Sequence, residues 1–147
     1  MGKACIETWL VITSEETKGV ESKMVRNIST IKIKRVYELP NDDDGVRILV
    51  DRLWPRGLAK EKARIDEWMK NIAPSAELRT WFGHKPERFA QFQSRYEQEL
   101  QSDPERLELA ERIRAIAAKQ NVTLLYAAKD TEHNHAVVLK QWLERAD

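Results

Sequence analysis

Apolar and polar residues follow two different periods along this chain, and together they predict strands interleaved with helices. In residues 46–50, valine and isoleucine recur at every second position, which is the period of a half-buried strand. Residues 122–127 form a continuous apolar run, typical of a strand covered on both faces in a parallel sheet. A further strand is expected over residues 31–37.

Other segments have the three- and four-residue spacing of amphipathic helices. Pro86 suits the first turn of a helix, and one apolar stripe follows it: Phe89, Phe92, Tyr96 and Leu100. Asp103 and Pro104 supply a cap and a first-turn proline for the next helix, which has a similar stripe. These stripes predict faces buried in a core.

Polar residues and glycine mark the ends of two more helices. Ser75 can accept from the free N–H groups of a helix over residues 76–82, and Gly83 is expected to end that helix. After the last strand, Asp130 or Thr131 is expected to cap a closing helix.

This order of elements predicts one layered α/β domain over residues 31–147, with a largely parallel sheet flanked by helices. Residues 63–68 fit either a helix or a short strand, and both alternatives stay open. Residues 1–30 show no sustained periodicity and are expected to be a poorly ordered extension of the domain. In the alternative, residues 9–12 add an edge strand or contact a partner.

Composition narrows the class of protein. The 25 basic and 24 acidic residues give a formal net charge of +1, so no global field attracts nucleic acid or an anionic membrane. Cys5 is the only cysteine, which excludes an intrachain disulfide. No apolar run approaches the length of a membrane span or a signal-peptide core. We therefore expect a cytoplasmic protein with no membrane partner, and the oligomeric state stays open.

Two loops carry the candidate chemistry. In parallel sheets, ligands bind outside the carboxyl ends of strands, so the loops after residues 50 and 127 should meet at one rim. Arginine forks suit phosphate or carboxylate oxygens, which predicts a small anionic ligand. The predicted ligand-binding residues are Arg52, Trp54, Arg56, Lys129 and Asn134. His135 and Asp51 are the candidates for acid–base catalysis, and whether any reaction occurs stays open.

A metal site is not predicted, and no cofactor is assigned. His133 and His135 diverge at a helix start, and no cysteine or clustered carboxylate accompanies them. The chain has no glycine-rich phosphate loop and no serine nucleophile elbow. His84 lies in a link between two helices with no evident partner.

Three segments, DRLWPRG, IDEWMKNIAPSAELRTWF and TLLYAAKDTEHNHAVVL, resemble the YeaO-like branch of a bacterial family of unknown function. The resemblance covers residues 31–146 and implies a small cytoplasmic α/β domain, without an established reaction, substrate or cofactor. It also implies that the wider family carries a cysteine late in the last strand and a Cys-His-Arg triplet at the start of the last helix. Here Tyr126 stands at the first position, and Asn134, His135 and Ala136 stand at the triplet. Cysteine-based chemistry is therefore not expected in this chain.

The main functional hypothesis is a small-molecule binding protein, or an enzyme of unassigned class, with an anionic ligand at the rim. The alternative is a nucleic-acid-associated or protein-interaction module that uses Arg52, Arg56 and Lys129 without catalysis. A purely structural partner domain is the third hypothesis, and a large exposed apolar patch would favour it.

Overall fold

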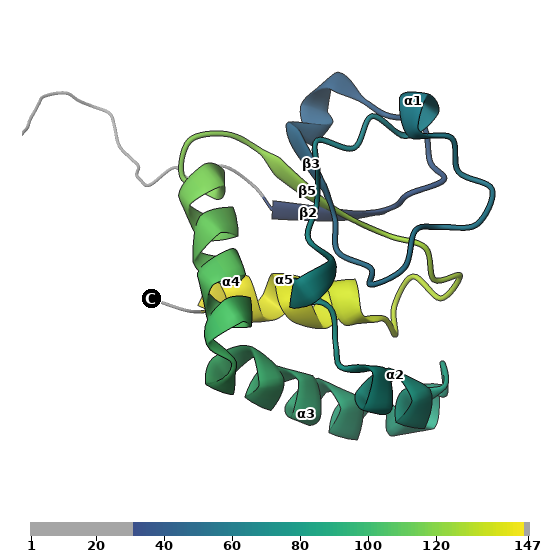
Figure 1. Ribbon diagram of the computed structural model, residues 1–147, viewed down its shortest axis with the longest axis vertical. Coiled ribbons are helices and arrows are strands. Elements are labelled where there is room, and N and C mark those ends of the chain that lie inside the picture. The colour runs from purple at the N-terminus through teal and green to yellow at the C-terminus, as the bar shows by residue number, and fades with distance from the viewer. Residues whose placement is uncertain (1–30, 146–147) are drawn as a thin grey trace, which may run out of the picture.

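The computed structural model describes residues 31–145, and these residues form a single α/β domain (Figure 1). The extension predicted over residues 1–30 lies outside the described residues. Within the described part of the chain, no helix is long and apolar enough to cross a membrane.

The sheet has four parallel strands in the order β2-β5-β3-β4. Their bounds are Ile31–Arg35 for β2, Val46–Leu49 for β3, Glu67–Trp68 for β4 and Val122–Tyr126 for β5. The prediction that residues 46–50 and 122–127 lie in one sheet as parallel neighbours is confirmed, because Val46 pairs with Val122 and Leu49 with Leu125. Both strands therefore end at the same edge of the sheet. The ambiguous segment at residues 63–68 ends as the short edge strand β4.

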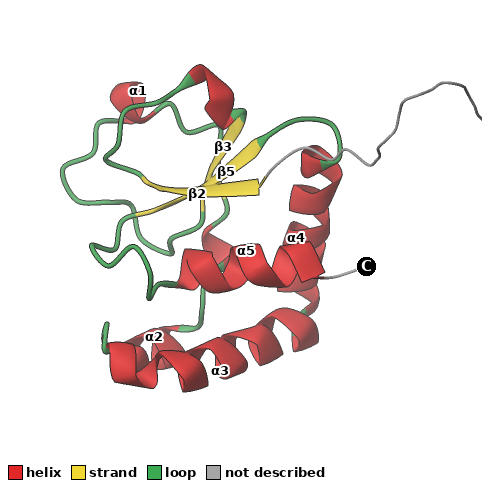
Figure 2. Ribbon diagram, turned by 180° about the vertical axis from the view of Figure 1, so that it is seen from behind, coloured by secondary structure: helices red, strands yellow, loops and turns green. Residues whose placement is uncertain are grey.

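The larger helices cover one face of the sheet (Figures 1 and 2). The helices are α1 (Lys60–Ala63), α2 (Ala76–Phe82), α3 (Phe89–Ser102), α4 (Pro104–Ala117) and α5 (His135–Arg145). Short 3-10 turns occur at Asp42–Asp44, Lys70–Ile72 and Pro86–Arg88. The opposite face is covered by the connection from β3 to β4, which contains only the single turn α1. Helices therefore flank the sheet unequally.

Local capping chemistry explains the helix ends. The Ser75 hydroxyl accepts from the Leu78 N–H at 3.2 Å, and Gly83 ends α2 in the left-handed conformation with φ of 55°. The prediction of Asp130 or Thr131 as the cap of the closing helix is wrong. Asn134 has that role, since its Oδ1 accepts from the Val137 N–H at 3.0 Å.

Two groups of buried side chains hold the layers together. The larger group lies between the sheet and the helices and includes the predicted stripe of α3, where Phe92, Tyr96 and Leu100 are at most 1% exposed. A smaller group lies on the opposite face, where Trp54 and Leu58 pack on the buried residues Val36, Leu49 and Leu125. The loop after β3 therefore supplies part of the core on the face without the larger helices.

A buried ion pair closes the amino-end edge of the sheet. Asp44 and Arg47 are 3% and 4% exposed, and their side chains are joined directly. Lys34 adds a contact of 3.2 Å to the same carboxylate, and Thr123 donates its hydroxyl to the Asp44 carbonyl at 2.7 Å. This edge is thus fixed by structural contacts, and the opposite edge is free to hold a site.

Candidate functional site

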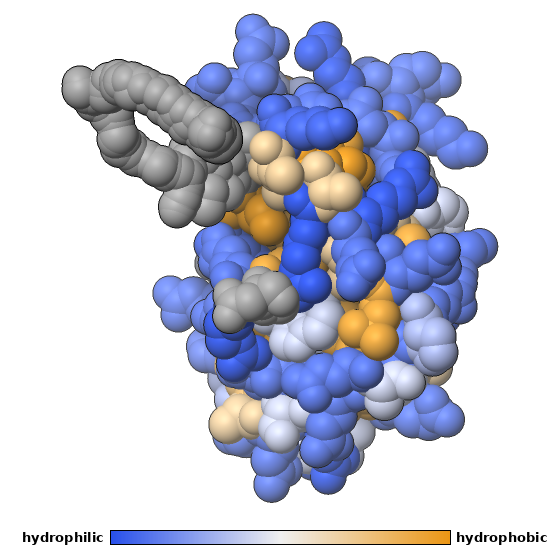
Figure 3. Space-filling view, turned by 90° about the vertical axis from the view of Figure 1, so that its left-hand side faces the viewer, coloured by the Kyte–Doolittle hydropathy of each residue, from blue (hydrophilic) through white to orange (hydrophobic). Residues whose placement is uncertain are grey.

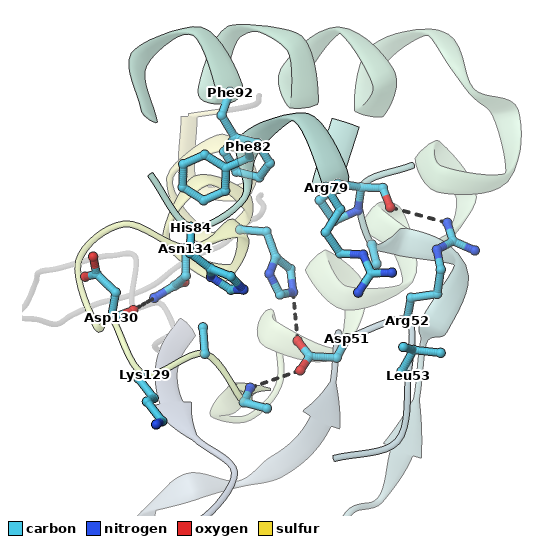
Figure 4. A pocket seen from close by; sticks show the side chains of 15 residues that line it. Asp51, Arg52, Leu53, Arg79, Phe82, His84, Phe92, Lys129, Asp130 and Asn134 are labelled. Atoms are coloured by element: carbon cyan, nitrogen blue, oxygen red, sulfur yellow. Dashed lines mark hydrogen bonds and ion pairs between the residues drawn. The ribbon is translucent and has the colours of Figure 1, made fainter. Parts of the chain in front are cut away.

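A pocket of about 540 Å³ lies beyond the carboxyl ends of β3 and β5 (Figure 4). One side is formed by residues 51–53, directly after β3, and by residues 127–130 and 134–135 around the β5–α5 loop. The other side is formed by residues 73–74, by α2 with the turn after it, and by Phe92 of α3. The two predicted loops therefore do meet at one rim, and α2 encloses the space from the other side.

Asp51 ties the end of β3 to the β5–α5 loop and to α5. Its Oδ2 accepts from the Ala127 N–H at 3.0 Å, and its Oδ1 lies 3.0 Å from Nε2 of His135. That ring nitrogen also lies 3.1 Å from the Val50 carbonyl. One N–H cannot be aligned with both oxygens, so Oδ1 is a buried acceptor without a well-aligned hydrogen bond. The carboxylate therefore takes the first backbone N–H after β5, which an external anion would otherwise contact.

The β5–α5 loop is shaped by Asp130 and Asn134. Asp130 Oδ1 accepts from the N–H groups of Glu132 and His133 at 2.9 and 3.0 Å, and these bonds hold the pKa of Asp130 below its usual value. Asn134 is 2% exposed and donates to the Asp130 carbonyl at 2.8 Å, in addition to its capping bond. Both side chains are thus occupied in building the loop.

Three cationic side chains line the pocket. Arg52 has only one hydrogen bond, a 3.4 Å contact from its guanidinium to the Pro74 carbonyl, and its buried Nε has no partner. The side chains of Arg79, in α2, and of Lys129 make no hydrogen bond or ion pair with any residue in the range 31–145. Figure 4 shows Arg79 and Arg52 on the same side of the pocket. None of these three positive charges forms an ion pair within the described part of the protein.

Sequence reasoning missed the contribution of α2. Arg79, Phe82 and His84 line the pocket only because α2 docks across the sheet edge, and no local pattern specifies that docking. Consecutive left-handed residues, Gly83 at φ of 55° and His84 at φ of 59°, turn the chain at the end of the helix. The glycine signals a helix end, but the direction of the turn depends on the packing.

Five of the seven predicted site residues line the pocket: Asp51, Arg52, Lys129, Asn134 and His135. Trp54 and Arg56 do not. The Trp54 indole donates to the Leu58 carbonyl at 2.9 Å and packs edge-on against Trp68 at a centroid distance of 5.5 Å. The Arg56 side chain is exposed. The loop crosses the end of the sheet after residue 53, so its second half lies over the other face. Whether the five residues bind a ligand stays a prediction.

The described residues contain no group of three or more histidine, cysteine, aspartate or glutamate side chains that could hold a metal ion. His133 and His135 instead have separate contacts, since His133 Nδ1 lies 3.0 Å from Asp130 and His135 faces Asp51.

The model of a family described as the inactive DUF488-N3 subclade matches residues 30–146. The chain belongs to this subclade. It is 50% identical over 114 residues to the uncharacterized protein YeaO of Escherichia coli, covering 77% of this chain and 96% of YeaO. It is 43% identical over 120 residues to an uncharacterized protein of Mycobacterium tuberculosis, covering 82% of this chain and 98% of the relative. The resemblance to a YeaO-like bacterial family is thereby confirmed. No solved structure matches the chain.

The fold also brings together two positions at which the sequence resemblance implies cysteines in the wider family. The side chain of Tyr126, at the end of β5, interacts with the side chain of Asn134 before α5. Burial, followed by the charge of Glu38, raises the pKa of Tyr126, so the phenol stays neutral around pH 7. In this member of the subclade, a neutral polar contact fills the place beside the pocket.

Proposed function

We propose that this protein binds a small anionic molecule, bearing a phosphate or a carboxylate, in the pocket at the carboxyl edge of the sheet, without catalysing a reaction on it. The observation that carries this proposal is the side chain of Arg79, which lines the pocket and has no hydrogen bond or ion pair to residues 31–145. Arg52, on the same side, is held by a single long hydrogen bond. A shared anion would satisfy both guanidinium groups and relieve their mutual repulsion.

The carboxylates of the pocket support an external anion as the missing partner. Asp51 is already engaged by Ala127 and His135, and Asp130 is engaged by the backbone of its own loop. Neither forms an ion pair with Arg52 or Arg79 among the described residues. The positive charge on the arginine side of the pocket is therefore available to a ligand.

Three observations favour binding over catalysis. His135 lies between Asp51 and the Val50 carbonyl, which suits a tie between β3 and α5. Tyr126 and Asn134 offer no thiol where the wider family is expected to carry cysteines. The family description also calls the subclade inactive. We accordingly assign Asp51 and His135 to positioning, and we place Arg79 beside Arg52 in the binding site in preference to Trp54 and Arg56.

The test is thermal unfolding of the full chain with sodium phosphate, sulfate or acetate at constant ionic strength. A ligand that binds only the folded state at ten times its Kd stabilises it by about 1.4 kcal/mol. Arg79→Ala should abolish most of this shift while changing the anion-free stability by under about 1 kcal/mol. Arg95→Ala is the matched control, because Arg95 is an exposed arginine of α3 that lies over Trp81 and outside the pocket.

An anion response that is equal in wild type, Arg79→Ala and Arg95→Ala would locate binding outside this pocket and refute the proposal. The absence of any response to every anion, at concentrations up to tens of millimolar, would refute it as well.

A second candidate is a module that binds single-stranded nucleic acid, and one surface observation favours it. Trp68 is 38% exposed, and Lys70 Nζ lies 5.3 Å from its ring centroid. Exposed aromatic rings beside cations are typical platforms for base stacking. A steep salt dependence of oligonucleotide affinity would favour this candidate over the pocket. The face seen in Figure 3 is mainly hydrophilic, with small separated apolar areas, so it offers no support for a purely structural partner domain.

A further inference from the structure

We infer that the ligand of this pocket is a hydrophobic carboxylate with a single negative charge. The inference rests on the anion-binding function proposed above and names the chemical class of the ligand. Three properties of the pocket lead to it: the nature of its walls, the balance of its charges, and the donors that remain free.

The walls are largely apolar. Seven of the residues around the space have apolar side chains: Leu53, Ala73, Pro74, Phe82, Phe92, Ala127 and Ala128. Leu53 is 61% exposed, although leucine gains from burial, and Phe82 and Phe92 stack at a centroid distance of 4.3 Å behind the opposite wall. A ligand with an apolar body would cover Leu53, whereas a bare inorganic anion would leave it in water.

The charges favour a monoanion. Arg52, Arg79 and Lys129 face two carboxylates, Asp51 and Asp130, so the lining carries one net positive charge when its histidines are neutral. A phosphate monoester carries close to two negative charges at pH 7 and would bring an excess charge near the fixed carboxylate of Asp51. A ligand with one carboxylate would balance the single net positive charge of the lining.

The geometry of the donors points the same way. Phosphate sites at helix starts use several backbone N–H groups, but here Asn134 takes that of Val137 in the first turn of α5, and Asp130 takes those of Glu132 and His133 just before it. The unpartnered donors that remain on the opposite side belong to the guanidinium groups of Arg52 and Arg79. A planar carboxylate accepts two parallel hydrogen bonds from such a fork.

Four probes separate these contributions: 2-naphthoate, 2-naphthyl phosphate, acetate and 2-naphthalenemethanol. The full chain, labelled with 15N, is titrated with each at pH 7 and equal ionic strength, and Kd is taken from amide shifts. We expect 2-naphthoate to bind at least about tenfold more tightly than any of the other three, since it alone combines the apolar body with one planar charge.

Two variants test the apolar wall with matched chemistry. Leu53→Ser should weaken 2-naphthoate about fivefold and leave acetate unchanged, because only the naphthyl body covers that side chain. Leu39→Ser is the control, since Leu39 is 85% exposed and lies outside the pocket.

The outcomes are distinguishable. If 2-naphthyl phosphate or acetate binds as tightly as 2-naphthoate, and Arg79→Ala weakens that binding, the pocket is an anion site but the ligand class inferred here is wrong. Equal losses in Leu53→Ser and Leu39→Ser would also overturn it. If no probe binds, or Arg79→Ala binds all of them as wild type does, the proposed function itself fails.

Discussion

Replacing Asp51 should lower stability and raise anion affinity at the same time. Its carboxylate accepts from the Ala127 N–H at 3.0 Å and lies 3.0 Å from His135 Nε2, so it links β3, the β5–α5 loop and α5. A hydrogen bond to a charged group contributes about 1.5–3 kcal/mol, and the partly buried Ala127 N–H would lose its partner. Asp51→Ala should therefore reduce the free energy of unfolding by about 2–3 kcal/mol, a fall in Tm of roughly 6–12 °C for a chain of this size.

Asp51→Asn separates the two effects. The amide oxygen can still accept from Ala127, so the loss of stability should be nearer about 1 kcal/mol. The fixed negative charge disappears from the pocket in both variants, and affinity for acetate or 2-naphthoate should rise about three- to tenfold, the range expected for one charge acting over several ångströms of partly solvated space. Urea unfolding and the same NMR titration measure the two quantities on one sample.

If Asp51 had a catalytic or ligand-binding role, replacing it would lower the affinity for the ligand. If Asp51 contacted the ligand as a hydrogen-bond acceptor, Asp51→Asn would weaken binding with little effect on stability. Unchanged stability in Asp51→Ala would likewise show that the contacts with Ala127 and His135 contribute little, and our assignment of Asp51 to positioning would be wrong.

Two further predictions concern the amino-end edge of the sheet. A Cβ added at Gly45 would lie 2.0 Å from the Asn121 carbonyl oxygen, at φ of 67°, so Gly45→Ala should cost at least about 2 kcal/mol in urea unfolding. Gly57→Ala is the control with open space at φ of 75°, and it should cost about 1 kcal/mol; equal losses would contradict the steric argument. Burial alone would raise the pKa of Asp44, but hydrogen bonds and ion pairs lower it below its usual value. The contribution of this carboxylate to the free energy of unfolding is therefore complete above about pH 4 and is lost as pH falls through the folded-state pKa. Asp44→Asn should be less stable than wild type at pH 7, and its stability should depend less on pH below pH 4.

Helix ends with local causes, and the strand pairing implied by the order of elements, could be predicted from the sequence. Ser75 and Gly83 bound α2 because a hydroxyl cap and a left-handed glycine act within a few residues. The parallel pairing of β3 with β5 followed from their apolar patterns and the intervening helices. The start of α5 was predicted too early in the sequence. Asp130 accepts from two N–H groups of the loop, as a helix cap would, but the helix itself begins only after Asn134.

The composition of the site could be predicted only in part, because half of it depends on tertiary docking. Asp51 and His135 could be predicted, because Asp51 follows a strand and His135 begins a helix at the same sheet edge. Arg79 and His84 were not, since their position depends on how α2 packs over Phe92. Sequence spacing gives no information on that packing.

The division of the DRLWPRG segment explains why it contains so many conspicuous side chains without all of them entering the pocket. Its first half, Asp51 and Arg52, faces the pocket, and its second half braces the loop from the other face. Trp68 donates from its indole to the Asp51 carbonyl at 2.7 Å and packs edge-on against Trp54. Trp54 in turn donates to the Leu58 carbonyl, and Tyr37 donates to the Arg56 carbonyl at 2.9 Å. These contacts hold the backbone of residues 51–58, so the aromatic side chains fix where the Asp51 carboxylate and the Arg52 guanidinium lie.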